Sequence, residues 1–209
     1  MTPAPVLAEE VAAALRGGGP VVALETTLVS HGFPGRQGLE VALAAEGRVR
    51  AAGAVPATVG VVDGAVRAGL TEPELERFAA AGESARKVGA RDLAACAVQG
   101  ALGATTVGGT LAVCRAAGIR FMGTGGTGGV HRGFAQTLDI SSDLPQLARR
   151  EAGADDRAVQ AGRQVPDPAA PFGRRGQHRR QLVVADRRYR RHVGEPAQRP
   201  LTLKRRSED

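Results

Sequence analysis

The sequence has few aromatic residues, few cysteines and almost no lysine, and each scarcity excludes a class of protein. Aromatic side chains make up 3% of the 209 residues and tryptophan is absent, so stacking platforms for single-stranded nucleic acid are not expected. The two cysteines, Cys96 and Cys114, lie in apolar surroundings and form neither a disulfide framework nor a C-x-x-C metal site. This cysteine usage favours a reducing compartment.

Long apolar runs are also missing. No segment approaches the roughly 20 apolar residues that a membrane-spanning helix needs, and residues 1–19 lack the basic start and apolar block of a signal peptide. A chain of 209 residues is expected to form about one domain and is long enough to bury a large core without disulfides. We therefore expect a soluble, cytoplasmic protein without a membrane partner.

Positive charge is abundant at only one end of the chain. Residues 1–148 hold 11 arginines, one lysine and 13 acidic residues, a net charge of −1. Residues 149–209 hold 15 arginines, one lysine and eight acidic residues, a net charge of +8. The overall charge of +7 therefore describes the last part of the chain and not the whole.

From about Glu151 onward the apolar spacing follows neither the strand nor the helix period for long. We therefore divide the chain into an α/β domain at 1–150 and an arginine-rich segment at 151–209. This segment has three explanations: a disordered basic tail, a tail that binds nucleic acid or a membrane surface, and an out-of-frame translation. We favour the third, because GC-rich genes read in a wrong frame yield an excess of arginine, alanine, proline and glycine.

The first part alternates strand and helix patterns, which predicts an α/β sheet with helices packed on its faces. Thr71 and Glu74 form a capping box that fixes the start of one helix. A polar loop is expected at 26–38. The expected elements are a helix at 7–15, strands at 20–25 and 57–64, helices at 39–52, 72–81, 92–99 and 108–117, and a strand at 119–124.

Two isolated side chains of this domain are candidates for chemistry. Glu25 ends an expected strand, where open α/β sheets place reactive groups, and burial would suit it to general acid or base catalysis. Lys87 is the only lysine before residue 204, and a compact donor with a tunable pKa suits a phosphate or a sugar hydroxyl. The structural alternatives are a loop glutamate and a solvated lysine. A lone loop histidine such as His31 is more typical of a turn.

The glycine-rich stretch 123–133 follows an expected strand and predicts a phosphate cradle, in which backbone N–H groups converge on an anion. It matches the G-x-G-x-x-G fingerprint only loosely, so a dinucleotide site is not expected. The alternative is a plain glycine-rich connection. The cradle would comprise Gly125, Gly126, Gly128, Gly129, His131 and Arg132.

The segment 139–143 places two carboxylates four residues apart with two hydroxyls between them. Asp139 would bind a hard divalent cation, since one carboxylate plus waters is typical of sites for Mg²⁺-like ions. For the second carboxylate the alternative is structural, with Ser142 or Asp143 as the N-cap of a following helix.

Seven motifs follow one another between about residues 7 and 150: VVALETTLVSHGFPGRQGLEVA, GAVPATVGVVDG, GLTEPELE, KVGARDL, GATTVGGT, GTGGTGGVHRG and TLDISSDLPQLA. Together they resemble the pseudouridine-5'-phosphate glycosidases. The resemblance implies a three-layer α/β/α sandwich with a mixed sheet that assembles as a homotrimer. It also implies that the C-terminal part of that fold is missing here.

The resemblance implies reversible cleavage of the C–C glycosidic bond of pseudouridine 5'-phosphate to uracil and ribose 5-phosphate, with a divalent ion, commonly Mn²⁺. At the matching positions it implies Glu25 as proton donor, Lys87 as a substrate-binding lysine, Val107 as a substrate-contacting backbone position, Asp139 as metal ligand, and Ser141, Ser142 and Asp143 as the adjacent substrate loop. The glycine cradle is our own interpretation and is not part of the resemblance.

The sequence departs from the family pattern after residue 150. The family continues into a segment close to V-V-x-A-G-x-K-S, whose lysine is the covalent nucleophile at the sugar C1′. The corresponding stretch here, 154–163, contains no lysine, and Ser142 and Gly89-Ala90 also differ from the usual residues. We therefore expect a frame shift near residues 150–155. The alternative functions are an inactive, truncated relative that binds a phosphosugar and a basic protein that associates with nucleic acid.

Overall fold

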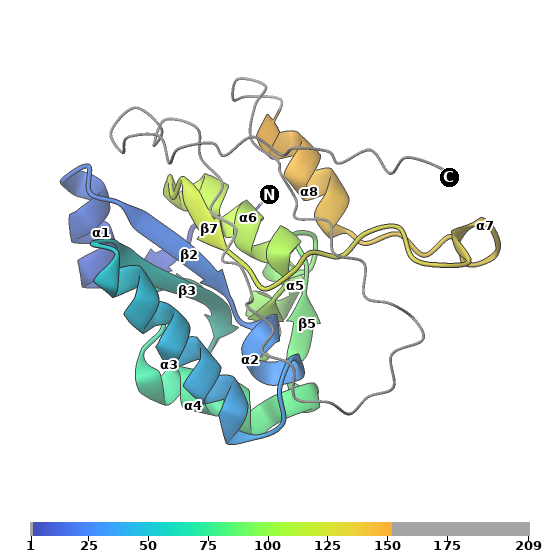
Figure 1. Cartoon of the computed structure of the whole chain (residues 1–209), viewed down its shortest axis with the longest axis horizontal. Coiled ribbons are helices and arrows are strands. Elements are labelled where there is room, and N and C mark those ends of the chain that lie inside the picture. Colours follow the sequence, from blue (N-terminus) through green and yellow to red (C-terminus); the bar gives the residue numbers. More distant parts are fainter. Residues whose placement is uncertain (1, 152–209) are drawn as a thin grey trace, which may run out of the picture.

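The structure is a computed structural model that describes residues 2–151, and these form one mixed β-sheet with helices on both faces (Figure 1). The strands are β1 (Val6–Leu7), β2 (Val21–Glu25), β3 (Val55–Val62), β4 (Ala65–Ala68), β5 (Arg86–Val88), β6 (Gly103–Thr105) and β7 (Phe121–Gly123). The main path is β1-β4-β3-β2-β7, and β6 joins β3 to β5. The predicted α/β class with a mixed sheet is confirmed.

Helices connect most of the strands. They are α1 (Glu9–Arg16), α2 (Thr27–His31), α3 (Arg36–Ala51), α4 (Glu72–Ala81), α5 (Leu93–Val98), α6 (Val107–Ala117), α7 (Phe134–Thr137) and α8 (Asp143–Glu151), with a 3₁₀ turn η1 at Gly82–Ser84. Within residues 2–151 no helix has the length and apolar character needed to cross a membrane. The capping box at the start of α4 is confirmed, since Glu74 accepts hydrogen bonds from the N–H and the hydroxyl of Thr71.

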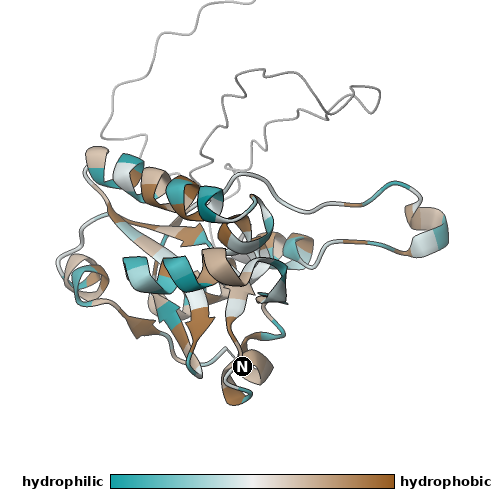
Figure 2. Ribbon diagram, turned by 90° about the horizontal axis from the view of Figure 1, so that it is seen from below, coloured by the Kyte–Doolittle hydropathy of each residue, from teal (hydrophilic) through white to brown (hydrophobic). Residues whose placement is uncertain are grey.

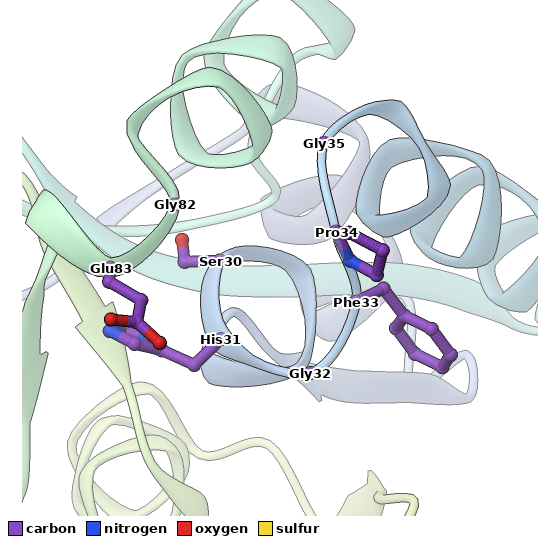
Figure 3. Close-up of a pocket in the computed structure, with 8 residues that line it drawn as sticks. All are labelled: Ser30, His31, Gly32, Phe33, Pro34, Gly35, Gly82 and Glu83. Atoms are coloured by element: carbon purple, nitrogen blue, oxygen red, sulfur yellow. The ribbon is translucent and has the colours of Figure 1, made fainter.

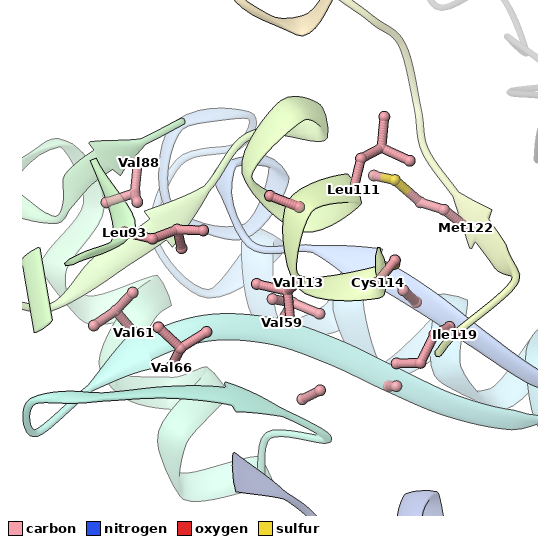
Figure 4. Close-up of a cluster of buried hydrophobic side chains, with 14 of the residues drawn as sticks. Val59, Val61, Val66, Val88, Leu93, Leu111, Val113, Cys114, Ile119 and Met122 are labelled. Atoms are coloured by element: carbon pink, nitrogen blue, oxygen red, sulfur yellow. The ribbon is translucent and has the colours of Figure 1, made fainter. Parts of the chain in front are cut away.

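The side chains of β2 alternate between two cores because successive residues of a strand point to opposite faces. Val21 and Ala23 join the larger cluster, which is built with α1, α5 and α6 (Figure 4). Val22 and Leu24 pack against Val49 of α3 on the other face. Beside them, α2, α3 and α4 bury a second cluster around the fully buried Phe78. The two cores make this region a sheet enclosed between helical layers.

Most of the elements that the sequence did not predict are short. The predicted start of the first helix at residue 7 is wrong. Val6 and Leu7 pair with β4 as the strand β1, and the helix begins only at Glu9. The expected loop at 26–38 contains the helix α2. The strand β4 follows a tight turn at Asp63 and Gly64, both with positive φ, and such an Asp-Gly pair is a known hairpin signal.

Residues 124–142 form an arm that leaves the body after β7 and returns at α8. Both views show the arm extending away from the sheet, with α7 at its tip (Figures 1 and 2). A single antiparallel bridge between Val130 and Ile140 ties its two sides together. Val130 is 61% exposed and Leu138 is 74% exposed, so these two apolar side chains of the arm are not buried against other described residues.

Two further sequence predictions concern the cysteines and the arginine-rich segment. Cys96 and Cys114 are both buried and free, as expected. The arginine-rich segment beyond residue 151, including the stretch 154–163 without lysine, lies outside the described residues. The domain division, the frame shift and the missing nucleophile therefore stay predictions.

Candidate active site

The candidate site lies where two strands meet end to end. β2 pairs in parallel with residues 55–59 of β3, and β6 pairs antiparallel with Gly60 and Val61. Because β4 occupies the opposite edge of β3 at these positions, β2 and β6 share one edge and approach each other from opposite directions. Their carboxyl ends therefore converge at Val59, which is the register partner of Glu25.

Three buried threonines hold this junction together. The carbonyl oxygen of Val59 accepts hydrogen bonds from Oγ1 of Thr26 (2.8 Å) and Oγ1 of Thr105 (2.7 Å). The N–H of Thr105 donates to Oγ1 of Thr26 at 2.8 Å, and Thr110 donates to Oγ1 of Thr105 at 3.0 Å. All three threonine side chains are 0% exposed. The network fixes the end of β2 against the start of α6.

Glu25 projects from this junction as a half-buried carboxyl group. Its Oε1 accepts a hydrogen bond from Oγ1 of Thr124 (2.5 Å), and its Oε2 accepts one from Oγ1 of Thr27 (2.8 Å). Burial raises the pKa of Glu25 above its ordinary value of 4.5, against the lowering by these two hydroxyls and by the N–H of Gly125. The nearby charge of Asp143 adds to the rise in pKa.

Asp143 is a second carboxylate at the site, and it is buried at the start of α8. Its Oδ1 accepts from the N–H of Gly108 in the first turn of α6 (2.7 Å), and its Oδ2 accepts from the N–H of Gly128 in the arm (3.1 Å). The positive end of the α6 dipole favours a negative charge at this position. The carboxylate thus joins α8, α6 and the arm, whereas the alternative interpretation made it the cap of its own helix.

Ser141 and Ser142 of the predicted substrate loop directly precede Asp143. Oγ of Ser141 accepts from the N–H of Asp143 at 3.2 Å, and Val107 is the buried first residue of α6. Oγ of Ser142 lies 3.3 Å from the position that a Cβ would take on Gly89. Lys87 is exposed in β5, two residues before Gly89. The structure thus gathers the predicted residues of the sheet, α6 and α8 at one edge.

The predicted phosphate cradle is divided between the site and the arm. The N–H groups of Gly125 and Gly128 point to Glu25 and Asp143, and the N–H of Gly126 donates to Oγ1 of Thr124 at 3.1 Å. These three donors therefore serve side chains of the protein itself. The carbonyl oxygen of Gly129 accepts from the N–H of Ser141 at 2.9 Å. The cradle stays a prediction.

The other members of the predicted cradle and metal site lie farther out on the arm. His131, Arg132 and Asp139 are all exposed. Nδ1 of His131 lies 2.6 Å from Oδ2 of Asp139, and the N–H of His131 donates to the carbonyl of Asp139 at 3.1 Å. The arm therefore places the predicted metal ligand beside an imidazole and apart from the buried carboxylates.

The arm offers two donor side chains to the predicted Mn²⁺. Within residues 2–151 no three His, Cys, Asp or Glu side chains gather closely enough to enclose an ion. Asp139 and His131 supply one carboxylate and one imidazole, a donor set that a largely hydrated Mn²⁺ accepts. The pair therefore fits an ion that keeps most of its water, and the metal stays a prediction.

His31 has the structural role that the sequence favoured. Its Nε2 lies 3.2 Å from the carbonyl oxygen of Ala85 and joins α2 to the chain after η1. It also lines a surface cavity of about 310 Å³, in which Phe33 and Pro34 lie opposite His31 and Glu83 (Figure 3). This cavity is separate from the carboxyl group of Glu25, which is not among its lining residues.

The sequence analysis missed the hydroxyl groups around Glu25. Thr26 and Thr27 follow it directly, and Thr124 follows β7, the neighbour of β2 in the sheet. The sequence did carry a signal for these hydroxyls, because hydroxyl residues follow two strands directly. The carboxyl ends of adjacent parallel strands lie together, so such residues are expected to be close in space.

A family model described as "Indigoidine synthase A like protein" matches residues 10–154. Among curated proteins, the pseudouridine-5'-phosphate glycosidase of Chloroflexus aurantiacus is 52% identical over 143 residues, which is 68% of this chain and 47% of the relative. The protein of the same name from Rhodospirillum centenum is 55% identical over 139 residues, 66% of this chain and 43% of the relative. The chain thus spans about half the length of these relatives.

Solved structures show the same fold. The prealnumycin C-glycosynthase AlnA, crystallised in complex with ribulose 5-phosphate, has a TM-score of 0.61 and 44% identity over 70% of this chain and 47% of its own. An indigoidine synthase A-like protein from Thermotoga maritima has a TM-score of 0.56 and 39% identity over 62% of this chain and 42% of its own.

Proposed function

The chain belongs to the Indigoidine synthase A like protein family, and from this membership we propose that its site acts on the C–C glycosidic bond of pseudouridine 5'-phosphate. The products would be uracil and ribose 5-phosphate, and the reaction would also run in reverse. The names of the curated relatives support the reaction. The AlnA complex, a C-glycosynthase with a bound pentulose phosphate, supports a phosphosugar ligand.

The observation that carries the proposal is the environment of Glu25. When the bond breaks by net hydrolysis, the uracil carbon keeps the bonding electrons and takes a proton, and the sugar carbon takes a hydroxyl group. A carboxyl group whose pKa is raised by burial retains a proton at higher pH than an ordinary glutamic acid and is suited to donate it. Glu25 is the group with this property at the carboxyl end of β2.

Asp143 supports this role by charge and by position. It stays among N–H donors of α6 and the arm, and its negative charge favours the protonated form of Glu25. Two neighbouring carboxyl groups whose surroundings differ in this way are typical of acid–base pairs with separate tasks. In the proposal Glu25 holds the proton, and Asp143 keeps the substrate loop at 141–143 in place.

The remaining parts of the proposal follow the sequence predictions. Lys87 would bind the substrate from the rim, Val107 would contact it through its backbone, and Ser141 and Ser142 would line it. Asp139 and His131 would hold a hydrated Mn²⁺, which would supply positive charge to an oxygen-rich sugar. We also propose a homotrimer and a cytoplasmic location.

The test is uracil release from pseudouridine 5'-phosphate by the full chain with Mn²⁺, followed by liquid chromatography. The proposal expects release that Glu25→Gln reduces by a factor of at least about 10², whereas Glu76→Gln, at an exposed position of α4, serves as the matched control. Equal rates in the wild-type chain and in Glu25→Gln would reject Glu25 as the proton donor.

Binding of a phosphosugar without turnover is the second candidate, and the absence of lysine at 154–163 favours it. Calorimetry with ribose 5-phosphate separates the two candidates. Binding without uracil release supports the second candidate, and the absence of both binding and release contradicts both candidates.

Sequencing the gene across codons 145–165 shows whether one base restores the V-V-x-A-G-x-K-S segment. In the same calorimetry, Arg132→Ala tests the predicted phosphate cradle. An unchanged affinity for ribose 5-phosphate would reject the cradle.

A further inference from the structure

The hydroxyl group of Thr124 has more acceptors within reach than it has hydrogens. Its Oγ1 lies 2.5 Å from Oε1 of Glu25 and 2.8 Å from the carbonyl oxygen of Gly126, and it accepts from the N–H of Gly126 at 3.1 Å. A threonine hydroxyl has one hydrogen and two lone pairs. It therefore donates either to Glu25 or to the Gly126 carbonyl, but not to both.

The choice depends on whether Glu25 carries a proton. When Glu25 is ionised, its carboxylate can only accept, so the single hydrogen of Thr124 must point to Oε1. When Glu25 is protonated, its O–H can donate to Oγ1 of Thr124, and the threonine hydrogen is then free to turn to the carbonyl of Gly126. One proton is gained by Glu25 in this exchange, and the threonine hydrogen only changes its partner.

We infer that Thr124 is a positioning residue that transmits the protonation state of Glu25 to the backbone of the glycine-rich loop at 125–129. In this arrangement the hydroxyl of Thr124 has a hydrogen-bond partner in either state, while the carbonyl of Gly126 gains one only when Glu25 is protonated. The loop is the start of the arm, which also carries His131 and Asp139. The relay therefore links the candidate proton donor to the segment that carries the predicted metal ligand.

Among the described residues, no other neighbour of Glu25 is placed to act as this relay. Thr27 donates to Oε2 at 2.8 Å, and within residues 2–151 its hydroxyl has no second hydrogen-bond acceptor. The sheet neighbours β3 and β7 present the uncharged Val59 and Gly123 at the end of β2. On the packed helices, Asp143 of α8 is the charged group that acts on Glu25, and His31 of α2 is held at Ala85.

The test is a pH titration by NMR of the full chain, labelled with ¹³C and ¹⁵N, which needs no turnover. The δ-carboxyl carbon of Glu25 reports its own protonation, and the carbonyl carbon of Gly126 reports the hydrogen bond from Thr124. We expect both signals to move with one common midpoint, above the ordinary value of 4.5 for a glutamic acid. In Glu25→Gln the shift at Gly126 should be absent.

Three substitutions separate the relay from a purely structural threonine. Thr124→Val keeps the shape but removes the hydroxyl, so the titration of the Gly126 carbonyl should be lost while Glu25 still titrates. Thr124→Ser restores the hydroxyl and should restore the common midpoint. Thr27→Val removes the other hydroxyl and should raise the midpoint of Glu25 without uncoupling Gly126.

Two results would overturn the relay. The first is a Gly126 carbonyl that does not respond while Glu25 titrates in the wild-type chain. The second is a response that persists in Thr124→Val, since it would then pass through the N–H of Gly125, which also bonds Glu25. The relevance of the relay to catalysis rests on the proposed function, but its physical test does not. A coupled titration in a chain that releases no uracil would leave the relay intact and reject only the activity.

Discussion

The body of the protein and its arm hold their acidic groups in opposite ways. In the body, Glu25 and Asp143 accept hydrogen bonds from hydroxyl and N–H groups of α2, of α6 and of the base of the arm. In the arm, Asp139 is exposed and bonded to His131 across a single bridge. Asp139 and Asp143 lie four residues apart in one sequence motif, yet Asp143 is buried and Asp139 is exposed.

This contrast shows what kind of task each region can support. A partly buried carboxyl group has its proton affinity set by the protein, because burial and fixed dipoles outweigh solvent. An exposed carboxylate has its charge screened by water and salt and is free to bind a hydrated ion. In the proposed function, proton transfer is assigned to Glu25 of the body and binding of a hydrated ion to the arm. Four experiments test this distinction.

The largest difference should appear in the core. Phe78→Ala removes a fully buried ring that packs against Gly60, where an added Cβ would lie 2.7 Å from the ring. The expected loss in the free energy of unfolding is about 3–5 kcal/mol. Leu138→Ala in the arm, at 74% exposure, should cost less than about 0.5 kcal/mol. Urea unfolding followed by circular dichroism measures both, and equal losses would contradict the contrast.

The second difference concerns the two aspartates. Asp143→Ala leaves the N–H groups of Gly108 and Gly128 without their acceptor, which should cost about 1–3 kcal/mol. Asp139→Ala removes one partner of an exposed pair and should cost about 0–1 kcal/mol. The same unfolding assay compares the two variants. A larger loss for Asp139 would mean that the arm is held as firmly as the body.

The third prediction is a pH dependence at Glu25. Because the pKa of Glu25 is raised in the folded state, the native protein holds a proton that the unfolded chain has released between pH 4.5 and that higher pKa. Stability then falls as pH rises through this window. Glu25→Gln removes the effect, so its stability relative to the wild-type chain should increase from acid to neutral pH. A difference that stays constant across a series of melting curves would refute the raised pKa.

The smallest effect is expected at the exposed pair of the arm. At a pH at which the imidazole carries a proton, His131→Ala should change the free energy of unfolding by less than about 1 kcal/mol, because an exposed ion pair contributes little to stability. The difference from the wild-type chain should shrink further as salt is added. Melting curves at low and high ionic strength measure it. A loss that survives high salt would show that the pair is shielded from solvent.

Long and strongly patterned elements could be predicted from the sequence, and so could the short strand β7, but several other short elements could not. The helix at 72–81 has a capping box and an apolar face, and α4 occurs there. The strands β5 and β6 have three residues each, too few to show a period, and they exist because they pair with each other and with β3. Tertiary pairing and not local propensity creates such elements.

The sequence indicated several residues of the candidate site, but neither the hydroxyl groups around Glu25 nor the contacts between distant elements. Glu25 stood out because it ends a strand, and the family resemblance added Asp143. That Asp143 binds the N–H groups of Gly108 and Gly128 depends on how α8 returns to α6, which no local pattern encodes. The hydroxyls of Thr26 and Thr105 likewise meet only because β2 and β6 share one edge of β3.

The end-to-end meeting of β2 and β6 also bears on how the protein folds. Thr26 and Thr105 are 79 residues apart in the chain, so the junction closes a loop that contains most of the domain. Closing such a loop costs entropy before any hydrogen bond rewards it, and folding slows as contacts become less local. The site should therefore be among the last parts to form during folding. A nascent chain would have to emerge past β6 before the carboxyl group of Glu25 reaches its native surroundings.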